Sequence, residues 1–284
     1  MEYLKTNELI SYFEIEKNFM PFSHEDFLIA HHGNYVEAMF AGLKPFCEYN
    51  GLTWSEQFLE SLTYTNSSLY HAIRQSILEP QQITFSPTSG FHHATPSGGR
   101  SFCSFSGQVI ASMKIYSEFG FSGAYLDLDG HYGNSIPDSY SYVKDLDKAI
   151  PVGCNVNLYG YGKNYITDLE RNLEFLEQKI LKDELHYLVF AHGADSHKDD
   201  DLGGQVNTEE WLECCHIFYK WIGQLDKKLK RPIPLTLSLF GGYRKDDYES
   251  VLSLHTSDLV ICLSTLCGSD IRYQSKVKPK NNSI

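Results

Sequence analysis

Four strand-like runs in this chain are each followed by a cluster of polar residues or glycines, and this repeat constrains the fold more than any other feature. The runs and the clusters that follow them are residues 83–85 before 90–93, 123–126 before 127–131, 186–191 before 192–195, and 235–240 before 241–243. In an open parallel α/β sheet, ligands bind beyond the carboxyl ends of the strands. The four clusters are therefore predicted to converge on one crevice.

Helical periodicity between these runs predicts a mostly parallel sheet with helices on both faces, because consecutive parallel strands need crossover connections. The predicted helices cover residues 105–119, 165–181, 209–225 and 247–254, and a further strand covers residues 152–158. Asn207 followed by Glu210 is typical of a helix N-cap. Amphipathic patterns over residues 25–40 and 56–77 predict helices beside the sheet or at its rim.

Length and composition favour one catalytic domain over residues 1–284. The chain has 284 residues with 42% hydrophobic content, which is enough for a full core. No linker rich in glycine, serine or proline interrupts the middle, and the four clusters would have to share one cleft.

The seven cysteines are odd in number and show no Cys-x-x-Cys spacing, which indicates a reducing compartment rather than a disulfide framework. The first residues lack the pattern of a secretory signal, and no run of about 18 apolar residues occurs. We therefore expect a cytoplasmic protein without a membrane partner. The oligomeric state is left open.

The formal net charge of −12 argues against direct nucleic-acid binding and favours a cationic peptide or polyamine. The basic residues 227–231 are predicted to form a solvated helix end. The polar tail, residues 276–284, has no periodicity and is predicted to be frayed.

Asp127, Asp129 and His131 form the most informative cluster. Residues two apart on a strand point to the same face, so these three side chains are expected to lie together. Carboxylates beside an imidazole form a mixed oxygen and nitrogen donor set that suits zinc or ferrous iron.

Together, in order and with compatible spacing, these clusters resemble the histone deacetylase family, and the resemblance covers roughly residues 20–260. Asn134 and the Leu202-Gly203-Gly204 segment resemble its class II branch and the bacterial acetylpolyamine amidohydrolases. The motifs that carry it are His92-His93-Ala94, Ser101-Phe102-Cys103, Asp127 to His131 with Gly133-Asn134, Gly193 to Gly204, and Gly241-Gly242-Tyr243. The resemblance implies a deacetylase-like α/β fold.

The resemblance implies that Asp129, His131 and Asp195 hold zinc, with Fe²⁺ as an alternative. Three protein ligands leave one position for water, as in catalytic zinc sites. The third ligand could by residue type also be one of the aspartates that follow Asp195, namely Asp199, Asp200 or Asp201. Of these, Asp200 is the second choice after Asp195. Whether the protein also binds a structural potassium ion is left open.

The resemblance also implies roles for the catalytic side chains. His92 and His93 supply the base for the water and the acid for the departing amine. His92 pairs with Asp127, and His93 faces Asn134, which is not itself a metal ligand. Tyr243 stabilises the oxyanion, and the preceding Gly241 and Gly242, assigned to substrate binding, allow a tight turn.

Two side chains near the motifs have competing interpretations. Phe102 is either a wall for the acyl-lysine stem or an ordinary core residue. Cys103 has apolar neighbours, which favour a small buried hydrophobic residue over a nucleophile.

The chain departs from the family in its loops. Residues 135–151 are shorter than the usual segment, so the opposing aromatic wall has no clear counterpart, although Trp54 or Phe58 could fill the gap. Residues 52–62 contain Glu56 and Glu60 but no aspartate for gripping the substrate backbone.

The implied activity is zinc-dependent removal of acetyl or longer acyl groups from lysine side chains of proteins. Acetylated polyamines or other small acyl-amines are the alternative substrates. A catalytically silent acyl-lysine-binding module is the alternative of another class, but the complete set of implied site residues argues against it.

Overall fold

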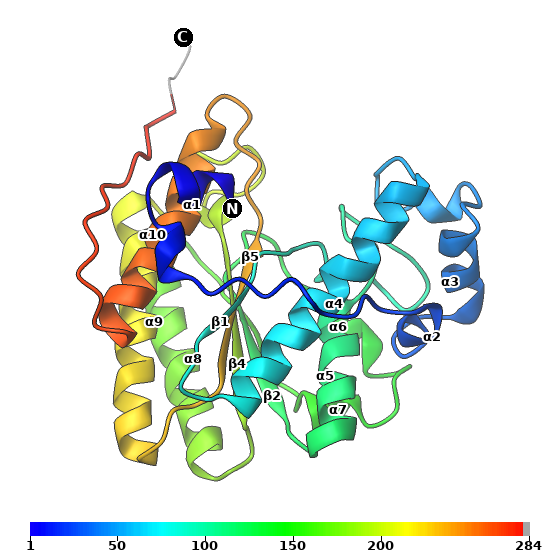
Figure 1. Ribbon diagram of the computed structural model, residues 1–284, viewed down its shortest axis with the longest axis horizontal. Coiled ribbons are helices and arrows are strands. Elements are labelled where there is room, and N and C mark those ends of the chain that lie inside the picture. The colour runs from blue at the N-terminus through cyan, green and yellow to red at the C-terminus, as the bar shows by residue number, and fades with distance from the viewer. Residues whose placement is uncertain (281–284) are drawn as a thin grey trace.

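Five parallel strands form the centre of the computed structural model, which describes residues 1–280 (Figure 1). The strands are β1 (Thr84–Ser86), β2 (Gly123–Asp127), β3 (Asn155–Asn157), β4 (Tyr187–Gly193) and β5 (Leu235–Phe240). Their order across the sheet is β1-β5-β4-β2-β3, and every neighbouring pair is parallel. The structure therefore confirms the predicted α/β fold.

Helices cover both faces of the sheet (Figure 1). On one face lie α4 (Glu56–Leu78), α5 (Gly107–Phe119), α6 (Ser135–Ser139) and α7 (Leu146–Ala149). On the other lie α8 (Lys163–Leu181), α9 (Thr208–Leu229) and α10 (Tyr248–Leu266). The short helices α1 (Glu2–Thr6), α2 (His24–Phe27) and α3 (Gly33–Phe40) precede them, with 3₁₀ turns at Ile10–Tyr12, Phe46–Glu48 and Ala194–Ser196.

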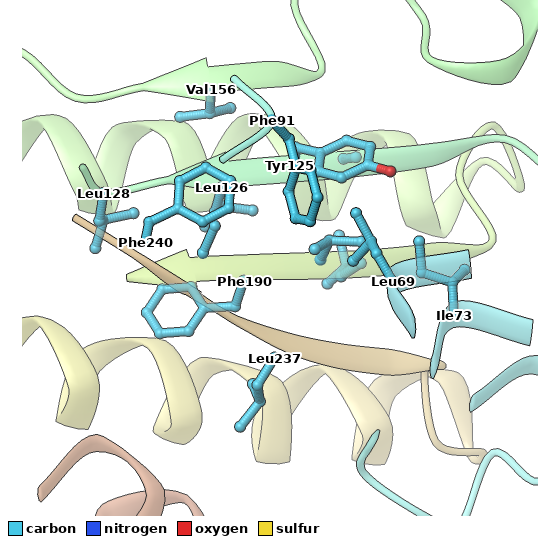
Figure 2. Close-up of a cluster of buried hydrophobic side chains, with 14 of the residues drawn as sticks. Leu69, Ile73, Phe91, Tyr125, Leu126, Leu128, Val156, Phe190, Leu237 and Phe240 are labelled. Carbon is cyan, nitrogen blue, oxygen red and sulfur yellow. The ribbon is translucent and has the colours of Figure 1, made fainter. Parts of the chain in front are cut away.

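The central strands are hydrophobic because helices bury both of their faces. All residues of β2 and β4 are buried. Figure 2 shows Leu69 of α4, Leu126 of β2 and Phe190 of β4 among the buried side chains of the core, and the Phe190 ring stacks on Phe218 of α9 with centroids 3.9 Å apart. Full burial of one such side chain contributes about 1.5–3 kcal/mol to the stability of the fold. The core therefore holds the strands in place, and with them the edge of the sheet where the polar clusters meet.

The predicted helix over residues 25–40 is wrong as one element, because the structure has α2 and α3 with a break between them. His31 lies in the break and is fully buried. Its Nδ1 lies 2.9 Å from the Thr95 carbonyl oxygen, and its Nε2 accepts from the Ser106 amide at 2.9 Å. These contacts with distant segments satisfy the ring, and periodicity along the sequence does not reveal them.

Two other predicted boundaries are also wrong. Helix α10 continues to Leu266, well beyond the predicted end at residue 254. The prediction stopped early because residues 256–259 are all buried and therefore show no amphipathic period. Strand β3 covers only Asn155–Asn157, since Gly153 before it has a positive φ of 87°.

The prediction of a frayed tail is wrong for residues 276–280. The amides of Lys276 and Lys278 donate to Ser253 Oγ at 2.7 Å and Ser250 Oγ at 3.0 Å, so the tail runs along α10. Buried serines on α10 supply partners that no pattern within the tail indicates. Residues 281–284 of the same prediction lie outside the described residues.

Within residues 1–280, none of the helices combines the length and the apolar character needed to cross a bilayer.

The predicted N-cap of α9 is confirmed and can be tested. Asn207 accepts from the Glu210 amide at 3.0 Å, and the Glu210 carboxylate accepts from the Asn207 amide at 2.9 Å. We expect Asn207→Ala to lower the free energy of unfolding by about 0.5–2 kcal/mol, the usual effect of losing a cap. Asn207→Asp keeps an acceptor and should stay near wild type in urea denaturation. Equal losses in both variants would contradict the capping role.

Candidate active site

The predicted site residues come together beyond the carboxyl ends of the strands. His92 and His93 follow β1, Asp129 and His131 follow β2, Asp195 follows β4, and Tyr243 follows β5. The ring centroids of His92 and His93 are 4.0 Å apart, and the His131 ring is 6.2 Å from His93 and 6.3 Å from Tyr243. Side chains that are far apart in the sequence therefore meet at the carboxyl edge of the sheet, the place where the crevice was predicted.

Asp129, His131 and Asp195 form a candidate metal centre, with one donor atom from each within 4.8 Å of the others. His131 Nδ1 lies 3.0 Å from Asp129 Oδ1 and 2.9 Å from Asp195 Oδ2. His131 Nε2 lies 3.0 Å from the Leu202 carbonyl oxygen, which accepts its proton and leaves Nδ1 for an ion.

The charges of this centre also fit a divalent cation. Asp129 and Asp195 are both buried. Burial and the neighbouring Asp195 raise the pKa of the Asp129 carboxyl to about 7. Hydrogen bonds to Asp129 and Asp195 raise the pKa of His131 to about 10. A cation between the carboxylates would replace the proton that the imidazole otherwise holds.

Glycines make room for the buried Asp195 carboxylate. A Cβ atom on Gly193 would lie 2.3 Å from Asp195 Oδ1, and one on Gly241 would lie 2.2 Å from the same atom. Gly242 has a φ of +151°, which favours glycine. Gly241 and Gly242, predicted to bind substrate, thus let β5 turn tightly beside the metal centre.

Asp200, the fallback ligand, lies outside the candidate metal cluster. Its Oδ1 accepts from the Leu202 amide at 2.9 Å, and its Oδ2 accepts from the Tyr243 amide at 2.7 Å. Asp200 therefore joins the loop after β4 to the loop that carries Tyr243. Sequence reasoning missed this positioning role, because nothing near Asp200 in the sequence indicates its partner in the other loop.

The two adjacent histidines have opposite environments. His92 Nδ1 lies 2.9 Å from Asp127 Oδ2, and His93 Nδ1 lies 3.0 Å from Asn134 Oδ1. Burial opposes the charged form of His92, but the negative charges of Asp127 and Asp129 outweigh it and raise its pKa to about 9. Burial and the nearby His92 lower the pKa of His93 to about 4. At neutral pH, His92 is therefore protonated and His93 is neutral.

Tyr243 keeps its hydroxyl proton in this crevice. Burial, followed by the charges of Asp129 and Asp195, raises the pKa of its hydroxyl well above the ordinary value. The phenol is therefore a hydrogen-bond donor throughout the neutral range.

Phe102 lies on the surface beside Tyr243. Its ring centroid is 5.8 Å from that of Tyr243, and 46% of the residue is exposed. The interpretation of Phe102 as an ordinary core residue is therefore wrong, and its position suits a wall of the crevice.

Cys103 is buried, as expected of a small hydrophobic residue. Burial raises the pKa of its thiol to about 12, so it is not a nucleophile at neutral pH.

Two further tyrosines lie at the same edge of the sheet. Tyr132 follows His131 and Tyr159 follows β3, and their rings stack with centroids 6.4 Å apart. Both are exposed. The opposing aromatic wall was expected within residues 135–151, so these two tyrosines were missed, although each directly follows a predicted strand or motif.

Trp54 packs away from this edge. Its indole Nε1 donates to the Met39 carbonyl oxygen at 2.7 Å, and its ring covers Gly42. Trp54 is therefore engaged with the N-terminal helices and does not fill the gap opposite Phe102.

Fold and site together define a parallel α/β protein with a candidate histidine–carboxylate metal centre at the carboxyl ends of its strands. Residues 1–146 match the model of the histone deacetylase domain, which is more than half of the 284 residues. The chain therefore belongs to the histone deacetylase family, as its motifs predicted. Family membership supports a deacetylase-type, hydrolytic function.

Other comparisons place the fold but not the substrate. A search of curated proteins finds no match. Among solved structures, the HDA15 HD domain is similar with a TM-score of 0.67 and 14% sequence identity, over 96% of this chain and 80% of that one. The family match contains His92, His93 and residues 127–131, whereas Asp195 and Tyr243 lie beyond it and are assigned by geometry.

Metal content tests whether Asp195 or Asp200 is the third metal ligand. We expect Asp195→Asn to lose one equivalent of bound metal per chain, because the centre loses one of three protein donors. Asp200→Asn is the matched control and should keep its metal, since the Asp200 carboxylate accepts from the Leu202 and Tyr243 amides and lies outside the candidate cluster. Elemental analysis of the purified variants measures both. Metal loss in Asp200→Asn with full retention in Asp195→Asn would reverse the assignment.

Proposed function

We propose that this protein is a zinc-dependent amidohydrolase that removes acetyl or longer acyl groups from lysine side chains. The observation that carries the proposal is the convergence of the Asp129–His131–Asp195 centre, the His92–His93 pair and Tyr243 on one crevice. Amide hydrolysis needs a base for water, an acid for the departing amine and a donor for the oxyanion, and these groups can supply all three.

Asp129, His131 and Asp195 would hold the zinc ion. When bound, zinc polarises an amide carbonyl and lowers the pKa of water towards about 7. Oxygen and nitrogen donors also suit Fe²⁺, which elemental analysis distinguishes from zinc.

His93 is the group best suited to move protons. If Nδ1–H donates to Asn134 Oδ1, Nε2 is left with a free lone pair that can take a proton from water. The same nitrogen can then deliver that proton to the lysine amine as the C–N bond breaks. Because His92 is held as an imidazolium by Asp127, it would add positive charge to the crevice rather than act as the base.

Tyr243 would donate a hydrogen bond to the carbonyl oxygen as negative charge develops there. Its raised pKa keeps the proton in place, and Asp200 fixes the backbone amide of the same residue. A donor positioned in advance stabilises the transition state more than the ground state.

The substrate class follows from charge and shape. The net charge of −12 favours approach of a cationic peptide or amine. The exposed Phe102 ring beside Tyr243 can cover the aliphatic stem of an acyl-lysine. An acetylated polyamine has a similar stem and charge, so it is the second candidate substrate, and direct comparison of the two substrates distinguishes them.

Tyr243→Phe tests the oxyanion role. We expect an intact fold and metal content but a roughly hundredfold or larger fall in kcat on an acetyl-lysine peptide, the usual scale for one lost oxyanion donor. Tyr248→Phe removes a hydroxyl from an exposed tyrosine and serves as the matched control. Wild-type turnover by Tyr243→Phe would remove the tyrosine from the mechanism.

Acyl chain length tests the openness of the crevice. Phe102 is half exposed and residues 135–151 form a short connection that contains α6 and α7, so we expect kcat/KM for butyryl-lysine and longer acyl-lysines to equal or exceed that for acetyl-lysine in the same peptide. Apolar pockets discriminate by only about 1–3 kcal/mol per methylene, so one relaxed wall changes preference by roughly tens-fold. A steep decrease in kcat/KM with each added carbon would show a closed channel.

A further inference from the structure

A second cluster of metal-competent side chains lies in the core, away from the crevice. It consists of His192 in β4, Cys215 in α9 and Asp258 in α10, and all three are buried. One donor atom from each lies within 4.8 Å of the others. We propose that His192, Cys215 and Asp258 hold a structural divalent metal ion of the zinc type.

The geometry of the sulfur and nitrogen donors supports this site. His192 Nδ1 lies 3.4 Å from Cys215 Sγ. In a tetrahedral zinc site, bonds of about 2.3 Å to sulfur and about 2.0–2.1 Å to nitrogen place these two atoms about 3.5 Å apart. The two side chains are therefore already separated as ligands of one ion would be.

The His192 imidazole is poorly satisfied by protein groups. Within residues 1–280 its Nε2 has no hydrogen-bond partner, and its Nδ1 contacts a thiol, which is a weak partner. The ring stacks on Trp211 with centroids 3.7 Å apart, which fixes its plane. A metal bond at Nδ1 would give this nitrogen a stronger partner than the thiol does.

The buried carboxylate of Asp258 also needs a positive charge. Its contacts are the Tyr219 hydroxyl, which donates to Oδ1 at 2.7 Å, and the Cys215 thiol. Among the described residues, no basic side chain forms an ion pair with it. Leaving a charge unpaired in the core is costly, so a nearby cation would stabilise the ionised form.

Charge balances when a divalent ion binds. Cys215 loses its thiol proton to solvent during folding, and Asp258 is ionised, so one thiolate and one carboxylate neutralise the two positive charges. The hydroxyl of Tyr219 donates to Asp258 Oδ1 and leaves Oδ2 available to an ion, since hydrogen bonds from outside the ligand set usually orient metal ligands.

The role of this ion would be structural. The three ligands come from three elements, so the ion would tie α9 and α10 to the strand that leads to Asp195. Because all three residues are buried, a substrate cannot reach the fourth position, which a trapped water molecule would fill.

Cobalt substitution tests the site independently of activity. A Co²⁺ ion bound to a thiolate gives a near-ultraviolet charge-transfer band, whereas the donors of the active-site centre are only oxygen and nitrogen. We expect the full chain, expressed in cobalt-supplemented minimal medium, to show this band. Cys215→Ser should abolish it and lower bound cobalt by one equivalent, while Cys214→Ser, the adjacent buried cysteine, should retain both.

Asp195→Asn provides a second readout that leaves the core intact. We expect this variant to lose the active-site ion and to retain the thiolate band. Absence of the band from both wild type and Asp195→Asn would overturn the core site, even if Cys215→Ser fails to fold. Because this result depends on sulfur ligation and not on turnover, it is separate from the fate of the proposed amidohydrolase activity.

Discussion

The arrangement of the crevice depends on two buried carboxylates, Asp129 and Asp195, held on either side of one imidazole. Their oxygens lie 3.0 and 2.9 Å from His131 Nδ1. Two like charges in a low-dielectric environment repel each other, so a cation or proton between them is required. The glycines at positions 193 and 241 make this arrangement possible, because any larger side chain there would occupy the space of the Asp195 carboxylate.

The same carboxylates set the protonation of the groups around them. Their field, with that of Asp127, keeps His92 protonated, and His92 in turn helps to keep His93 neutral. Tyr243 retains its proton beside the same negative charges. The crevice therefore holds a cationic imidazole, a neutral imidazole and a neutral phenol close together, a division of charge that suits the proposed amide hydrolysis.

Local patterns predicted the elements that repeat a clear period. The boundaries of β5 and the cap of α9 follow from an apolar run and from the Asn207–Glu210 pair. The break before α3 and the ordered tail along α10 depend on contacts between distant segments, such as His31 with Thr95 and Lys278 with Ser250. Such contacts satisfy backbone or ring atoms across space, so periodicity cannot reveal them.

The sequence by itself determined the parallel α/β fold and the clusters that meet at the ends of its strands, because both follow from local alternation and from the geometry of crossover connections. Only the tertiary structure places Asp195 beside Asp129 and His131 and Asp200 against the Tyr243 amide, since both are aspartates after the same strand. It also exposed Phe102 and brought Cys215 and Asp258 to His192. The meeting of Cys215, Asp258 and His192 depends on packing between α9, α10 and β4, which no single segment encodes.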